Sequence, residues 1–466
     1  MKKPVTALLL FCACALAEAP SAVAIRNAKI VTVSGPVIAK GTVVIRHGLI
    51  EAVGENVPVP ADAWLVDGEG MTVYPGLIDS LSTVGMPGVA PAAGATTGGR
   101  GGGRGQATPA TPTVPAAAAT ATVERARGPE DRPATTSWLI AADELLAADR
   151  RIETVRGGGI TTAVTFPTRG IFAGQGSIID MLSGEKAAEL VLVPSVGQYI
   201  SLSRGGGGGG GGGGGFPSSL MGTISYIRQI YLDAAHYQLV KDAYAKDPRG
   251  MERPEYDRAL EGVLSSKRIL LPANRLVEID RMLRFAAELK QPTILYGARE
   301  SYRPEAAELL KKSGVPVLVS IRWPEPSRDA NPEDVDSLRT LETRDQAASA
   351  PAVLQKAGVK YALYSDGLDQ PRDIQRAVKK AIDAGLSRED AIRALTLSPA
   401  QIYGVADRLG SIEKGKIANL VVTKGELFDD RTRIEMIFVD GRKYTPAADT
   451  TPGGRGPATD DPGANQ

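Results

Sequence analysis

The chain has 466 residues, enough for one large domain and a smaller one, and its 54 basic and 53 acidic side chains give a formal net charge of +1. A net charge so close to zero provides no strong field to draw the protein towards nucleic acid, an anionic membrane or an acidic substrate. Both cysteines, Cys12 and Cys14, lie near the N-terminus, so the chain beyond them offers no disulfide, thiolate nucleophile or cysteine-ligated zinc.

The N-terminus has the order of a secretory signal peptide. Two lysines precede the apolar run 7–17, and the small-residue triplet 22–24 follows it. We expect residues 1–24 to be a signal peptide cleaved after Ala24, and the remainder to be exported to the periplasm or the extracellular space. Lipidation at Cys14 is the alternative, but its surroundings match a lipobox poorly. The apolar run is too short to cross a bilayer and no second long run follows, so we expect no membrane span.

Short β-branched runs separated by turns occupy both ends of the remaining chain. Residues 25–72 and 409–446 contain strand-like segments, with hairpin signals at 47–48 and 440–441. Two such segments at opposite ends of a chain can close into one domain. We therefore predict a small composite β-sandwich, with everything else inserted between its halves.

Residues 73–408 have a different rhythm, in which amphipathic helices alternate with short buried strands. In one repeat, apolar residues at helical spacing over 279–289 lead to a strand that Pro292 opens. Alternation of this kind implies a parallel sheet. Its density over so long a segment predicts an α/β fold of the (β/α)8 TIM-like barrel type, with a doubly wound sheet as the alternative.

Two insertions interrupt this pattern. Residues 91–134 are rich in Ala, Gly, Thr and Pro, and residues 204–215 are almost entirely glycine. Neither buries enough apolar surface to offset chain entropy, so we expect both to be flexible, as well as a disordered tail over 447–466. The run 98–106 also resembles an RGG segment that contacts RNA, but we favour a solvated glycine-rich insertion and expect no nucleic-acid partner.

Two carboxylates close predicted strands, where barrel enzymes carry their chemistry. Asp79 ends "VYPGLID" and Asp366 ends "KYALYSD". A carboxylate at such a position ligates a metal, acts as a general base, or caps the following turn. The residue type alone does not choose among these roles.

The stretch "VYPGLIDS", residues 73–80, resembles the first-strand motif of the amidohydrolase superfamily, in which Pro-Gly-Leu-Ile-Asp is followed by His-x-His. Residues 394–422 are similar to that superfamily's passage from its last barrel helix back into the sandwich, and "GGGITTAVTF" resembles its exported, imidazolonepropionase-like branch. The resemblance implies hydrolysis of carbon–nitrogen bonds other than peptide bonds, often in cyclic amides. In such a reaction the attacking water is activated on zinc or a similar ion, and an acid at the end of the last strand accepts a proton.

Carried over by position, the resemblance places Ser80 and Ser82 where the motif has its two histidines. Gly297 stands near the position of a further histidine. Asp366 matches the last-strand acid and is the one candidate catalytic residue, with Asp79 as a second acid of interest.

The whole chain contains just two histidines, His47 and His236, and neither lies near a predicted strand end. Because the imidazole and thiolate ligands that favour zinc are missing, we expect no cofactor, although the family usually uses zinc or another divalent metal. Asp79, Asp366 and nearby serine hydroxyls would form only a weak oxygen cage for Mg²⁺ or Ca²⁺.

These observations favour a catalytically impaired amidohydrolase-like protein. We expect it to bind a small amide or cyclic imide, or to pair with itself or with an active relative as a subunit. An active hydrolase with an unconventional site built on Asp366 is the alternative. A purely structural subunit of an oligomer is a third hypothesis.

Overall fold

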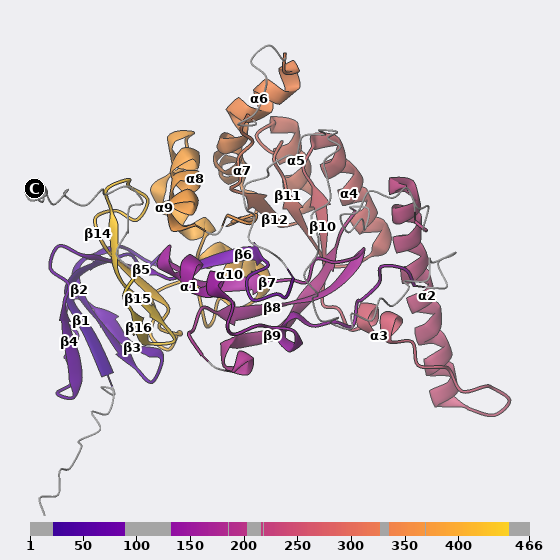
Figure 1. The fold of residues 1–466 in the computed structure, drawn as a ribbon, viewed down its shortest axis with the longest axis horizontal. Coiled ribbons are helices and arrows are strands. Elements are labelled where there is room, and N and C mark those ends of the chain that lie inside the picture. The colour runs from indigo at the N-terminus through magenta and orange to yellow at the C-terminus, as the bar shows by residue number, and fades with distance from the viewer. Residues whose placement is uncertain are drawn as a thin grey trace, which may run out of the picture.

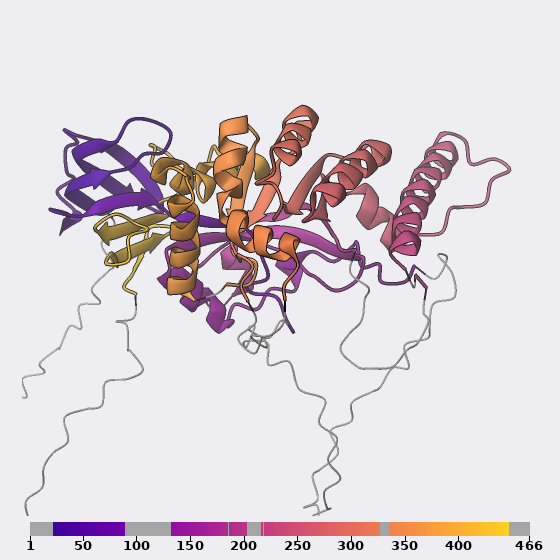
Figure 2. The same cartoon turned by 90° about the horizontal axis from the view of Figure 1, so that it is seen from above.

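The computed structural model describes residues 22–88, 132–184, 186–202, 216–217, 219–326, 335–368 and 370–446. Residues 1–21 of the predicted signal peptide, most of the first predicted insertion, all of the second and the predicted tail lie outside the described residues. Two eight-stranded sheets organise the described chain. The first lies at one end of the molecule and the long helix α2 (Leu220–Lys246) at the other (Figures 1 and 2).

The first sheet joins the two ends of the chain. Its strands lie in the order β16-β15-β14-β5-β1-β2-β3, with β4 beside β1. The strands are β1 (Ala22–Ile30), β2 (Ile38–Arg46), β3 (Leu49–Gly54), β4 (Ala63–Asp67), β5 (Thr72–Pro75), β14 (Leu420–Lys424), β15 (Arg433–Val439) and β16 (Arg442–Tyr444). Antiparallel pairing of β5 with β14 joins the N-terminal and C-terminal strands, so both chain ends share one continuous hydrogen-bonded sheet.

The two predicted hairpins are confirmed. His47 and Gly48 connect β2 to β3, and Asp440 and Gly441 connect β15 to β16. All four residues have positive φ, between 49° and 77°, which is the backbone geometry of a type I′ turn. The two turns also touch, because a Cβ on Gly48 would lie 2.4 Å from Oδ1 of Asp440. Glycine is therefore required at this position for space as well as for conformation.

The second sheet is a nearly closed barrel whose strands follow the chain order. They are β6 (Leu77–Ser82), β7 (Ile160–Thr165), β8 (Phe172–Asp180), β9 (Val191–Ile200), β10 (Ile269–Ala273), β11 (Thr293–Gly297), β12 (Val317–Ser320) and β13 (Tyr361–Tyr364). The predicted alternation of helix and strand holds from β9 onwards but differs at β8, which runs antiparallel to both neighbours. The connection from β7 to β8 spans only residues 166–171, too few for the helical crossover that a parallel strand requires.

Helices pack around the outside of the barrel sheet and between it and the first sheet. Besides α2 they are α1 (Arg150–Gly157), α3 (Arg258–Leu264), α4 (Leu276–Leu289), α5 (Pro304–Ser313), α6 (Leu338–Gln346), α7 (Ala350–Ala357), α8 (Pro371–Asp383), α9 (Arg388–Ala394) and α10 (Leu397–Tyr403). Local sequence sets their ends: the Ser387 hydroxyl caps α9 by accepting a hydrogen bond from the N–H of Asp390 at 3.0 Å. In the described part of the chain, no helix is long and apolar enough to cross a bilayer.

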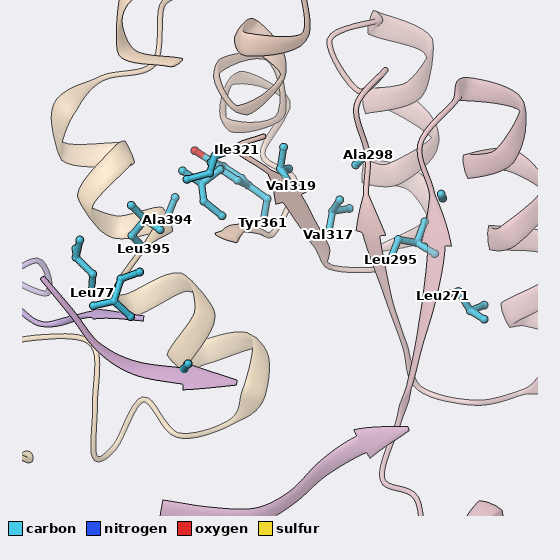
Figure 3. Close-up of a cluster of buried hydrophobic side chains, with 14 of the residues drawn as sticks. Leu77, Leu271, Leu295, Ala298, Val317, Val319, Ile321, Tyr361, Ala394 and Leu395 are labelled. Carbon is cyan, nitrogen blue, oxygen red and sulfur yellow. The ribbon is translucent and has the colours of Figure 1, made fainter. Parts of the chain in front are cut away.

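The barrel strands bury side chains on both faces. Outward-facing residues such as Leu295 and Val317 share one buried cluster with Ala394 and Leu395 at the end of α9 (Figure 3). A second cluster, which includes Leu270 and aliphatic residues of the neighbouring strands, fills the space that the sheet encloses. The sheet is therefore a packed core, and any ligand site must lie where its strands end.

β1 begins at Ala22, so the triplet on which the predicted cleavage site rests lies inside a strand. Ala22 and Ala24 are buried and pair with β2 on one side and with β4 on the other. We expect a chain that begins at Ile25 to be less stable than one that begins at Ala22 by about 2–4 kcal/mol, because several backbone hydrogen bonds are lost. Chemical denaturation of the two chains measures the difference, and equal stability would show that residues 22–24 contribute nothing to the sheet.

Candidate functional site

Side chains close the barrel where its first and last strands meet. β6 and β13 are the two ends of the strand order, and the residues at their junction bridge them. The Ser80 hydroxyl donates to the carbonyl oxygen of Leu363 at 2.7 Å. Ser365 donates from its backbone N–H to Oδ1 of Asp79 at 3.0 Å and from its hydroxyl to Oδ2 at 2.5 Å. We call Asp79, Ser80, Leu363 and Ser365 the barrel seam.

The seam is sealed from water. Ser80 is fully buried, Asp79 is only 3% exposed, and the Tyr403 hydroxyl on α10 donates to the carbonyl of Ser80 at 2.7 Å. Burial raises the pKa of Asp79 to about 6, and the hydrogen bonds from Ser365 and Ser82 offset only part of that effect. Asp79 is therefore a structural carboxyl that holds two strands together, rather than one that faces a ligand.

Asp366 follows the end of β13 and lies at the mouth of the barrel. Its backbone has a φ of +52°, and its side chain is about one-third exposed. Its Oδ2 accepts hydrogen bonds from Nη2 of Arg299 at 3.0 Å and from the Ser320 hydroxyl at 2.7 Å. The carboxylate is thus ion-paired to a guanidinium and hydrogen-bonded to a serine hydroxyl.

The other two positions that the resemblance singles out, Ser82 and Gly297, are held by local contacts. The Ser82 hydroxyl accepts a hydrogen bond from the N–H of Val84 at 3.2 Å. Gly297 ends β11 with a φ of +103°, and a Cβ there would lie 2.4 Å from Oδ1 of Asn274. A larger residue at 297 would have to displace Asn274 and adopt a strained backbone.

An aromatic layer lies beneath the mouth. The rings of Tyr199 and Tyr296 stack with centroids 5.1 Å apart, and Phe166 contacts Tyr199 at 5.8 Å. Tyr364, on β13, belongs to the same buried cluster. Burial raises the pKa of Tyr199, Tyr296 and Tyr364, so these phenols remain neutral. They close the barrel interior below Asp366 and give the mouth an aromatic floor.

Comparisons with known proteins agree with this architecture. Residues 275–448 match the amidohydrolase family. The structure superposes on that of an amidohydrolase from Thermotoga maritima MSB8 with a TM-score of 0.68 and 25% identity, covering 90% of this chain and 99% of the other. Residues 275–448 are therefore similar to the amidohydrolase family, and the fold as a whole is similar to that of the Thermotoga maritima protein.

Curated relatives match this chain over short segments. It is 35% identical to the imidazolonepropionase of Flavobacterium johnsoniae over 109 residues, which are 20% of this chain and 26% of that protein. It is 36% identical to the adenine deaminase of Moorella thermoacetica over 69 residues, which are 15% of this chain and 11% of that protein. The matches thus cover about a quarter or less of each relative.

The residues at the barrel mouth do not fit the zinc that the resemblance implies. In the described ranges, no three or more His, Cys, Asp or Glu side chains gather where they could hold a metal ion. His47 lies in the β2–β3 turn, and His236 is exposed on α2. Neither histidine belongs to a barrel strand. A zinc site needs three or four nitrogen, sulfur or carboxylate ligands, and this mouth offers a guanidinium-paired Asp366 and bonded serine hydroxyls.

The sequence analysis found Asp366 but missed the side chains around it. Arg299, Ser320 and Arg322 gather at the mouth, and Nη1 of Arg322 donates to the carbonyl of Asp366 at 3.4 Å. Each of these three residues ends or follows one of the neighbouring strands β11 and β12. Reading the polar residue after every predicted strand would have identified them.

The buried carboxyl of Asp79 predicts a dependence of stability on pH. Its pKa rises from an ordinary value of 3.8 to about 6 on folding. Its contribution to stability is therefore complete below about pH 4 and is lost as the pH rises through 6. Asp79→Asn keeps a neutral group that accepts from the Ser365 N–H and donates to its hydroxyl. We expect this variant to gain about 2 kcal/mol relative to the wild type between pH 4 and pH 8.

Denaturation by urea at each pH measures this gain. Asp407→Asn is the control, because Asp407 is exposed and its replacement removes the same formal charge. A difference between Asp79→Asn and the wild type that stays constant from pH 4 to pH 8 would contradict the account of Asp79.

Proposed function

We propose that this chain is a catalytically impaired amidohydrolase that binds a small amide or cyclic imide at the barrel mouth. One observation carries the proposal. The hydroxyls of Ser80 and Ser82 stand where the resemblance implies metal ligands, and both are engaged in hydrogen bonds to the backbone. The names of two relatives, an adenine deaminase and an N-acetylglucosamine-6-phosphate deacetylase, describe reactions that break carbon–nitrogen bonds, which supports a ligand of the amide class.

The groups at the mouth complement such a ligand. Arg299 and Arg322 supply N–H donors for an amide or imide carbonyl, and the carboxylate of Asp366 accepts from an imide N–H. Nε of Arg299 is buried and has no hydrogen-bond partner among the described residues. The ligand-facing donors of this proposal are therefore the terminal N–H groups of Arg299 and Arg322.

The proposal extends to location and assembly. The order of charged, apolar and small residues at the N-terminus supports export to the periplasm or the extracellular space. An impaired copy of an enzyme is retained when its scaffold still does something useful. Association with itself or with an active relative is therefore part of the proposal, beside ligand binding.

Hydrolysis assays and binding measurements on the same preparation test this function. We expect no turnover of cyclic imides, hydantoins or dipeptides above background when Zn²⁺, Mn²⁺ or Mg²⁺ is supplied. In calorimetric titration, we expect a cyclic imide to bind and Arg299→Ala to weaken its affinity by about tenfold, since one charge-assisted hydrogen bond is lost. Arg281→Ala, at an exposed position on α4, is the control.

The alternative is an active hydrolase built on Asp366. The short contact between the Ser320 hydroxyl and Asp366 favours it, because a carboxylate can orient a nucleophile or a water. Under this alternative, turnover is measurable and disappears in Asp366→Asn. Turnover by the wild type that is lost in Asp366→Asn would contradict the proposal of impairment and support the alternative. If the protein neither turns over nor binds any amide, both the proposal and this alternative are refuted.

A further inference from the structure

The helix α2 is longer than its contacts with the body of the molecule require. It has 27 residues, or about 40 Å at 1.5 Å per residue. Its buried side chains all lie between Thr223 and Ala234, in the first half of the helix. The second half projects beyond the rest of the described chain (Figure 1). Most helical stability in proteins comes from the packing of a face, so a partner for this half would stabilise it.

The chain itself supports one side of the projecting half. The Tyr237 hydroxyl donates a hydrogen bond to Oε1 of Glu261 on α3 at 2.9 Å. Lys241 forms an ion pair with the same carboxylate. Tyr237 and Lys241 are four residues apart and therefore lie on the same side of the helix. At 3.6 residues per turn, the side opposite to them carries Leu232 and Leu239.

That opposite side carries an apolar stripe. Leu232 is 66% exposed, Leu239 is 68% exposed, and the exposed Ala235 lies between them. Spacings of three and four residues put all three on one face of the helix. A single exposed leucine is ordinary, but two leucines on either side of an alanine form a surface on which a second helix can pack. The small alanine lets the two helix axes come close where they cross.

Opposite charges flank the stripe at equal distances. Arg228 lies seven residues before Ala235, and Asp242 lies seven residues after it, so both are exposed on the face of the stripe. Arg228 binds Glu288 of α4 through Nε and Nη2, at 2.5 and 2.8 Å. Asp242 accepts a hydrogen bond on Oδ1 from Gln238 at 2.7 Å. Nη1 of the arginine and Oδ2 of the aspartate take no part in these bonds and can bind a further partner.

We propose that two copies of this chain associate through α2, with the helices antiparallel and a two-fold axis passing near Ala235. The symmetry sets Arg228 of each copy against the partner's Asp242, because the two residues are equally far from the axis. It also sets Leu232 against the partner's Leu239. Each projecting half then lies along the half of the partner's helix that packs on its own body. A parallel pair would instead set like charges against each other, so the charges select the antiparallel arrangement.

This dimer gives a surface to the self-association that the proposed function includes, and it rests on that part of the proposed function alone. A contact confined to one pair of helices is smaller than the roughly 1,200 Å² of standard stable interfaces, so we expect a dissociation constant of about 10–100 μM. A dimer that forms although no cyclic imide binds would refute the proposed ligand and leave this surface intact. A monomer that binds a cyclic imide would do the reverse.

Cysteine cross-linking tests the position of the two-fold axis. Cys12→Ser and Cys14→Ser remove the two cysteines of the chain, so a cysteine introduced on α2 is then the one thiol present. In this background, Ala235→Cys should give a disulfide-linked dimer on mild oxidation, because the axis brings both copies of residue 235 together. Ala243→Cys is the matched control, since this exposed alanine would lie about 24 Å from its own copy. Equal cross-linking at both positions would show a parallel or unspecific contact and overturn the proposal.

Charge reversal, followed by analytical ultracentrifugation at about 200 μM protein, tests the pairing of Arg228 with Asp242. Arg228→Glu sets two acids against each other at both contacts, and Asp242→Lys sets two bases there, so we expect either variant alone to be a monomer. An equimolar mixture should dimerise, because the new carboxylate of one copy then meets the new ammonium of the other. This recovery excludes misfolding as the cause of the loss.

The control for charge reversal is Arg433→Glu, at an exposed position on the first sheet, and it should dimerise like the wild type. Variants at 228 and 242 that dimerise as well as the wild type would place the contact elsewhere and overturn the proposal. A wild type that remains a monomer at this concentration would also overturn it. A monomer is the result expected if a different protein, or another segment of the same chain, covers the stripe.

Discussion

The closure of the barrel depends on hydrogen bonds made by side chains. β6 and β13 meet at the seam, where Ser80 donates to a carbonyl of β13 and Asp79 accepts two hydrogen bonds from Ser365. Every other pair of neighbouring barrel strands is joined by a backbone ladder. The seam is therefore the point at which the sheet becomes a barrel, and its polar groups are satisfied by one another inside a dry core.

The same residues cannot serve the seam and a metal ion together. The resemblance to the superfamily places ligands at Ser80 and Ser82, but in this chain both hydroxyls bond to the backbone and the neighbouring carboxyl is buried. A second polar junction lies where the barrel meets the first sheet. There Asp180 accepts hydrogen bonds from Thr162 and Asn419, and burial raises its pKa to about 7. Buried carboxyls thus accept hydrogen bonds at both joints of the molecule, whereas Asp366 faces the mouth.

Much of the fold could be predicted from local signals. The type I′ turns at 47–48 and 440–441 follow from the dipeptides His-Gly and Asp-Gly, and their backbones have the positive φ that such turns need. The helix–strand repeats after β9 follow from apolar spacing. The antiparallel β8 was missed because a short connection, not a periodicity, decides its direction. The sequence could likewise identify Asp366 as an acid after a strand. It could not place Arg299 and Ser320 against it, since that contact depends on how three strands align at the barrel mouth.

A titration of the metal-free protein with Zn²⁺, followed by the melting temperature, tests the central claim most directly. A ligand that binds only the folded state raises its stability, so a resident zinc site would give a saturable rise with one equivalent. If the seam has taken the place of the ligands, the melting temperature should stay unchanged at concentrations up to about 100 μM, where sites with histidine or cysteine ligands are filled. A saturable rise that Asp79→Asn or Asp366→Asn abolishes would contradict the account.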